Sequence, residues 1–76
     1  MSVERVYEGE SRDGKLQEAL EIAIQRLNAD LGEGGVRDAS ASWVITEISG
    51  KYGGIAGFTS VKAKITAKRS PEWELG

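Results

Sequence analysis

The stretch FTSVKAKITAK, from Phe58 to Lys68, has the most regular side-chain pattern of the chain. Apolar and polar residues alternate along it, which is typical of a β-strand with one face in the core. We therefore expect a strand whose apolar face packs inward and whose lysines point outward. The apolar positions are Val61, Ala63, Ile65 and Ala67, and the polar ones are Lys62, Lys64, Thr66 and Lys68.

A partner strand is expected just upstream, in ASWVITEIS from Ala41 to Ser49. Strict alternation places Trp43 and Ile45 on one face of this strand and Val44 and Ile48 on the other. Both faces are then partly apolar, unlike those of a strand that has one face in water.

The glycine-rich connection between these strands reads SGKYGGIAGFTS, residues 49–60. A Walker loop or a dinucleotide fingerprint needs a particular glycine order and a helix after it, and this segment has neither. We interpret it as a long hairpin connection whose glycines accept positive φ angles.

An amphipathic helix is predicted over residues 15–31, KLQEALEIAIQRLNADL, and GEGG at 32–35 ends it. Ile22 falls outside the apolar stripe. The stripe consists of Leu16, Leu20, Ala23, Ile24, Leu27 and Leu31.

A first strand is expected over residues 3–10, VERVYEGE, which makes the element order β-α-β-β. The sequence thus predicts an α+β fold, a three-stranded antiparallel sheet with one helix on one face. We expect the third strand in the middle, where its lysines would face Glu4 and Glu8 of the first strand. The second strand would then be an edge, open to a neighbouring subunit.

Length and composition indicate one domain spanning residues 1–76, with an irregular tail over 69–76. A chain of 76 residues buries only about 60% of its unfolded surface, so its core is marginal. It has no Cys and no His, which excludes disulfides and disfavours zinc sites or a catalytic triad. Oligomerisation is the remaining route to stability. We expect no enzyme activity.

The charge balance, 10 basic against 12 acidic residues, argues against a general nucleic-acid binder. A single-strand binding face on Lys62, Lys64 and Lys68 would also need interleaved aromatic residues, and only Phe58 is close. No apolar run reaches the roughly 20 residues of a membrane helix. The expected location is the cytoplasm.

Two tryptophans are the largest candidate contact residues. Trp43 either packs in a core or interface or offers its indole face to a flat ligand. Trp73 follows Pro71 and is expected to dock the tail on its own or a neighbouring subunit. Ile22 is either an isolated exposed residue or part of a subunit contact.

Three segments give the chain a resemblance to the dodecin family over about residues 3–68: GES at 9–11, EALEIAIQRL at 18–27 and EISG at 47–50. In the helical segment the matching positions are Ala19, Leu20, Ala23, Ile24 and Arg26.

The resemblance implies a small β-α-β-β protein that forms hollow dodecamers and binds a flavin (FMN, FAD or riboflavin). Trp43 lies near the family's second-strand Trp and would stack on the ligand. Phe58 and Thr59 would line the pocket, in the region where the family carries a flavin-bonding Gln.

Two hypotheses of function follow. The first is a homo-oligomer that binds or stores a small aromatic ligand, with Val44, Ile45, Ile22 and Trp73 at subunit contacts. The second is a ligand-free structural or interaction module, which the long hairpin and the absence of a third-strand Gln favour.

Overall fold

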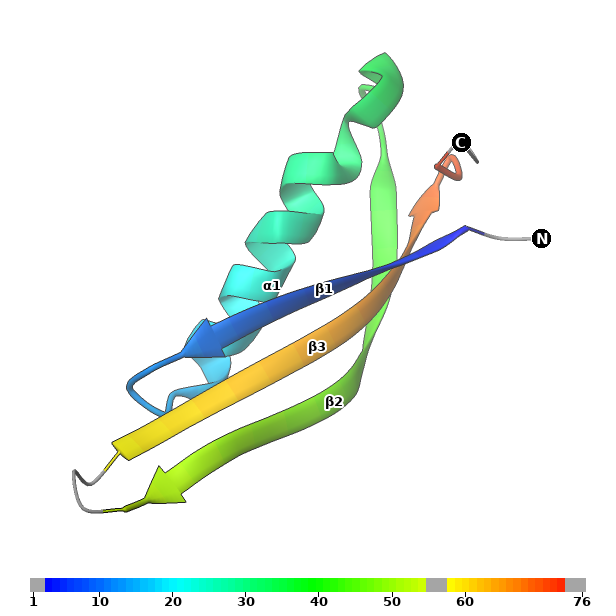
Figure 1. Ribbon diagram of the computed structural model, residues 1–76. Coiled ribbons are helices and arrows are strands. Elements are labelled where there is room, and N and C mark those ends of the chain that lie inside the picture. The colour runs from blue at the N-terminus through cyan, green and yellow to red at the C-terminus, as the bar shows by residue number, and fades with distance from the viewer. Residues whose placement is uncertain (1–2, 55–57, 74–76) are drawn as a thin grey trace.

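The computed structural model describes residues 3–54 and 58–73. Its elements are β1 (Glu4–Ser11), α1 (Leu16–Leu31), a 3-10 turn (Glu33–Gly35), β2 (Ser40–Gly53) and β3 (Phe58–Ser70). The strands form one antiparallel sheet in the order β1-β3-β2. The helix packs across β1 and β3 (Figure 1). The expected α+β architecture, with the third strand in the middle and the second at an edge, is confirmed.

The register between β1 and β3 follows the charges. Glu4 is opposite Lys68 and Glu8 is opposite Lys64, and both pairs form ion pairs with N–O distances of 3.3 Å. Partly exposed pairs of this kind contribute only ~0–1 kcal/mol each. They therefore favour this register over others more than they stabilise the fold.

The helix and β1 meet through small residues. A Cβ atom on Gly9 would lie 1.9 Å from the Ala19 carbonyl oxygen and 2.6 Å from the Ala23 amide nitrogen. Ala19, Ala23 and Ala63, the β3 partner of Gly9, are all fully buried. At this point the helix backbone rests directly on the strand.

The buried face of the helix differs from the predicted apolar stripe at two residues. Leu16, expected inside, is 42% exposed and is the first residue of the helix. Ala19 was not expected in the stripe but is fully buried, since the close approach at Gly9 leaves room only for a small side chain. The main core cluster consists of Tyr7, Ala23, Leu27, Ile65, Ala67 and Trp73.

A β-bulge changes the faces of β2. Ile45 is opposite Ile65, but Glu47 is already opposite Lys64, so Thr46 is an extra residue in β2. Beyond the bulge Ile48 pairs with Ala63 and lies on the helix side of the sheet, together with Trp43 and Ile45. The prediction that Ile48 shares a face with Val44 is therefore wrong. One inserted residue inverts the alternation that a continuous strand would keep.

The third strand also runs further than expected. Arg69 and Ser70, assigned to the irregular tail, are the last residues of β3. Of the remaining tail, Trp73 is buried in the core of its own chain. The single helix among the described residues, α1, is neither long nor apolar enough to cross a membrane.

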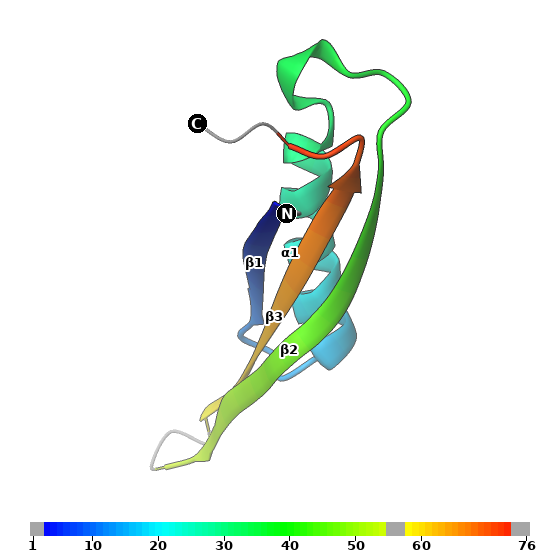
Figure 2. The same ribbon diagram turned by 90° about the vertical axis from the view of Figure 1, so that its right-hand side faces the viewer.

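The molecule is elongated, 48 × 22 × 19 Å, because the β2–β3 hairpin continues past the helix and β1 (Figure 2). Its radius of gyration is 14.8 Å, whereas a compact domain of this length has about 11 Å. Its accessible surface is 5494 Å², roughly 1,000 Å² more than a folded monomer of this mass exposes. The isolated chain thus leaves an unusually large surface in water.

Candidate functional site

The most prominent uncovered feature is an apolar row along the helix side of β2. Trp43, Ile45 and Ile48 make up this row, which we call the β2 stripe, and they are 38%, 40% and 53% exposed. The helix lies over β1 and β3 and leaves the edge strand bare. Large apolar side chains in a continuous row are typical of interaction or ligand surfaces.

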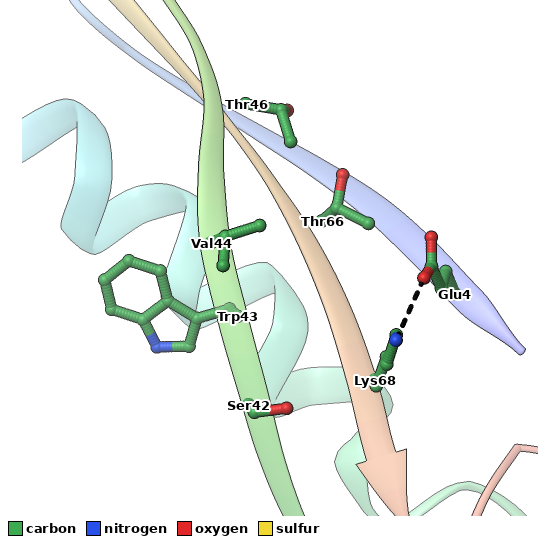
Figure 3. Close-up of a pocket in the computed structure, with 7 residues that line it drawn as sticks. All are labelled: Glu4, Ser42, Trp43, Val44, Thr46, Thr66 and Lys68. Atoms are coloured by element: carbon green, nitrogen blue, oxygen red, sulfur yellow. Dashed lines mark ion pairs between the residues drawn. The ribbon is translucent and has the colours of Figure 1, made fainter. Parts of the chain in front are cut away.

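The outer face of β2 carries a shallow hollow of about 380 Å³. Figure 3 places the Trp43 ring on the opposite side of the β2 ribbon from Ser42, Val44 and Thr46. The hollow itself is polar at one end, where Lys68 and Glu4 form their ion pair. The indole ring is therefore available from the helix side. The residues that line the hollow are Glu4, Ser42, Trp43, Val44, Thr46, Thr66 and Lys68.

Trp43 and Thr59, two of the residues expected to line one ligand pocket, lie far apart along the sheet of the folded chain. Trp43 is opposite Ala67 on β3, whereas Thr59 lies eight residues earlier on the same strand, next to Gly14. Eight strand residues span about 27 Å. The Phe58 side chain lies outside the described residues. A pocket with both Trp43 and Thr59 therefore needs a second copy of the chain.

The four residues expected at subunit contacts have different environments. Val44 is 61% exposed on the outer face and Ile45 is 40% exposed in the β2 stripe. Ile22, expected outside the helical stripe, is half-buried beside Gly9. Trp73 was expected to dock the tail either on its own chain or on a neighbouring subunit. It is only 2% exposed and packs in the core of its own chain.

A cluster of aromatic and cationic side chains that the sequence did not predict lies at the same end of the sheet as Trp43, where Arg5 on β1 and Trp43 on β2 are both opposite Ala67 on β3. The guanidinium groups of Arg5 and Arg69 both lie over the Trp73 ring, at 4.7 Å and 5.6 Å from its centroid. Its indole N–H donates to the Asp30 carbonyl oxygen over 3.1 Å. Tyr7 is tilted against it, with 6.4 Å between the ring centroids. We call this group the Trp73 cluster.

Arg69 connects the tail to the end of the helix. Its buried side chain donates hydrogen bonds to the carbonyl oxygens of Leu31 and Glu33, at 2.9 and 2.8 Å, and to that of Pro71 at 2.8 Å. A fourth and longer bond, 3.4 Å, reaches Glu72. The guanidinium thus satisfies carbonyl groups that a helix C-terminus leaves unpaired, and its charge complements the helix dipole.

Ionisable side chains around the cluster are coupled. Burial raises the pKa of Tyr7, and the hydrogen bond from its hydroxyl to Asp30 Oδ2, 2.9 Å long, adds to this effect. Hydrogen bonding from Arg5 lowers the pKa of Glu33, and the same contact raises the pKa of Arg5. These shifts have structural causes, namely burial and contacts within the cluster.

The outer lysines are mostly neutralised. Lys64 pairs with Glu8 and also with Glu47, at 3.9 Å, and Lys68 pairs with Glu4. In the described part of the chain, no three acidic residues come together in a way that could hold a metal ion.

No family model matches the chain, and no curated protein or solved structure matches it either.

Proposed function

We propose that the chain assembles into a closed, dodecin-like homo-oligomer that binds and stores a small planar aromatic ligand, with a flavin as the first candidate. The observation that carries this proposal is the half-exposed Trp43 ring in the uncovered β2 stripe. An indole in an apolar row can stack on a flat ligand with one face of its ring. In the proposed assembly a neighbouring subunit shields the other face of the ring from water.

The shape of the isolated chain supports the assembly. Its excess surface, about 1,000 Å² over that of a typical monomer, is similar to the roughly 800 Å² that one partner buries in a standard protein interface. The 14-residue strand β2 is also an edge with unpaired backbone groups. A neighbouring copy could cover both the stripe and this edge.

The ligand site in this proposal is shared between subunits. Trp43 supplies the stacking face from one copy. Thr59 and Phe58 come from the hairpin end of another, because Trp43 and Thr59 are about 27 Å apart along the sheet of one chain. The resemblance to dodecins, which rests on the residues quoted above, suggests the flavin.

The test is a titration of riboflavin and FMN with purified protein, with light scattering on the same sample. Ligand fluorescence should be quenched at micromolar protein, and Trp43→Ala should abolish quenching while the assembly persists. Val6→Ala, which shortens an apolar side chain that is 57% exposed on β1, at the opposite edge of the sheet, is the control for the loss of Trp43. Unquenched flavin fluorescence with the unmodified protein would refute flavin binding.

The second candidate is a ligand-free structural module in which Trp43 only packs against a neighbouring subunit. The distance between Trp43 and Thr59 within the chain favours it. In that case Trp43→Ala should disrupt the assembly itself.

A further inference from the structure

The outer face of the sheet is arranged in cross-strand rows, and the row at Lys62 differs from the others. Lys68 and Lys64 each form an ion pair with the glutamate opposite them on β1. Lys62 is opposite Glu10 in the same register. Yet in residues 3–54 and 58–73 no carboxylate forms an ion pair with Lys62.

The next row toward the hairpin has no carboxylate at all. The strand β1 ends at Ser11, opposite Val61, so Ser60 has only its β2 partner Lys51 beside it. In turn, Lys62 is opposite Ser49 on β2. Because side chains two residues apart share a face, these four residues all lie on the outer face.

Two ammonium groups and two hydroxyl groups thus form a compact square on two adjacent strands. They surround a hollow of about 450 Å³ whose remaining lining residues are Glu10 and Gly50. Gly50 keeps the strands close, since a Cβ atom there would lie 2.3 Å from the Ser60 carbonyl oxygen. We call this the Lys51–Lys62 hollow.

We propose that the Lys51–Lys62 hollow binds an oxyanion of the phosphate class, either inorganic phosphate or the phosphate group of a monoester. Lysine ammonium groups and serine hydroxyls are the donors that phosphate oxygens accept. Hydrogen bonds between charged partners are about twice as strong as neutral ones. The two lysines outnumber the single carboxylate, which leaves the hollow with a net positive charge.

This site is separate from the ligand site proposed above. Trp43 pairs with Ala67, five residues along β3 from Lys62, which corresponds to about 17 Å. The Trp43 ring also projects on the other side of the β2 ribbon from the outer-face side chains (Figure 3). Phosphate binding therefore does not depend on flavin binding, and either proposal can fail without the other.

Glu10 gives the proposal a directional test. Its carboxylate lines the hollow and opposes an incoming anion. Glu10→Gln removes that negative charge, keeps the side-chain size and should tighten phosphate binding several-fold. If no anion bound in the hollow, this substitution would leave the anion affinity of the protein unchanged.

The experiment is a titration of the ¹⁵N-labelled protein with inorganic phosphate at constant ionic strength, followed by the amide shifts of Gly50, Lys51 and Ser60. Chloride at equal ionic strength is the reference, because general screening acts equally with both salts. Glycerol 3-phosphate is titrated in parallel. A tighter complex with it identifies a monoester as the ligand, and equal or weaker binding identifies free phosphate.

The double variant Lys51→Ala/Lys62→Ala should bind phosphate about tenfold more weakly or not at all, since two charge-assisted contacts are lost. The matched control is Lys15→Ala/Arg37→Ala, which removes two exposed cations elsewhere and should bind as the unmodified protein does. Equal shifts with chloride and phosphate, or an equal loss in both double variants, would overturn the proposal.

Discussion

Gly9 is the residue at which β1 and α1 come closest, and its missing side chain is what allows the contact. Inserting one methyl group into a packed core typically costs about 1–3 kcal/mol of folding stability. Gly9→Ala should reach the upper end of this range, because its Cβ atom would meet helix backbone rather than a movable side chain.

Chemical denaturation of the two glycine variants checks this. Gly32→Ala is the matched control, with an ordinary φ of −89° and no atom nearer than 3.6 Å to the added Cβ. It should change the free energy of unfolding by less than about 0.5 kcal/mol. Equal stability of the two variants would contradict the close contact at Gly9.

Tyr7 predicts how stability changes at high pH. Burial and the hydrogen bond to Asp30 raise its pKa above the ordinary value of 10.0, so the folded state holds the phenolic proton more tightly than the unfolded state. This contribution is complete below pH 10 and is lost as the pH rises through the raised pKa.

Tyr7→Phe should therefore lower stability at pH 7 but remove part of the decline above pH 10.0, as measured by urea denaturation at each pH. The control is Tyr52→Phe, whose ring is almost fully exposed and whose removal of a phenol should leave the profile unchanged. Parallel profiles for Tyr7→Phe and the unmodified chain would exclude this linkage.

At the scale of elements, Arg69 joins the end of β3 to the end of α1. Its removal leaves the carbonyl groups of Leu31, Glu33 and Pro71 without a donor. An unsatisfied buried polar group costs about 1–3 kcal/mol. Arg69→Met should thus destabilise the fold by about 3 kcal/mol and move the emission of the released Trp73 to longer wavelength.

The neighbouring substitution Lys68→Met is the control, because it removes a lysine whose ion pair is largely exposed and worth ~0–1 kcal/mol. Arg69→Lys should be intermediate, since an ammonium group cannot reproduce the geometry of a planar guanidinium. A stable Arg69→Met variant with unchanged emission would show that the tail is held by packing alone.

Among the elements, the strand order and register could be predicted from the sequence, but the β-bulge in β2 could not. The alternation in β3 and the glutamates of β1 predicted the strand order and register, because both patterns act between near-regular strands. The bulge at Thr46 has no such signal, since Thr is an ordinary strand residue. It moved Ile48 to the helix side and made the β2 stripe continuous.

The Trp73 cluster could not be predicted for another reason. It brings Arg5, Asp30 and Arg69 to one indole from three distant segments. Each looked like a solvated charge on its own, and only the packed fold brings them together. The candidate stacking residue Trp43 was identifiable from its type and strand. Its distance from Thr59 depends on the hairpin register, which the long glycine-rich connection concealed.

At the scale of the whole molecule, the elongated shape and bare β2 stripe argue for self-association. Ile45 lies in the middle of the stripe and is 40% exposed in the isolated chain. Replacing it with lysine adds a charge that would have to be desolvated if another copy covered this face, which is costly when the charge is unpaired. Ile45→Lys should therefore dissociate the oligomer and lower its thermal stability.

The matched control is Val6→Lys, which adds the same charge at a residue that is 57% exposed on the outer face of β1, the opposite edge of the sheet. Light scattering at micromolar concentration should give a monomer mass for Ile45→Lys and the mass of the oligomer for Val6→Lys and the unmodified chain. In the proposed assembly, subunit contacts supply part of the stability of a small core. The melting temperature of the unmodified chain should then also rise with concentration, whereas that of Ile45→Lys should not. A well-folded monomer of the unmodified chain would refute the assembly.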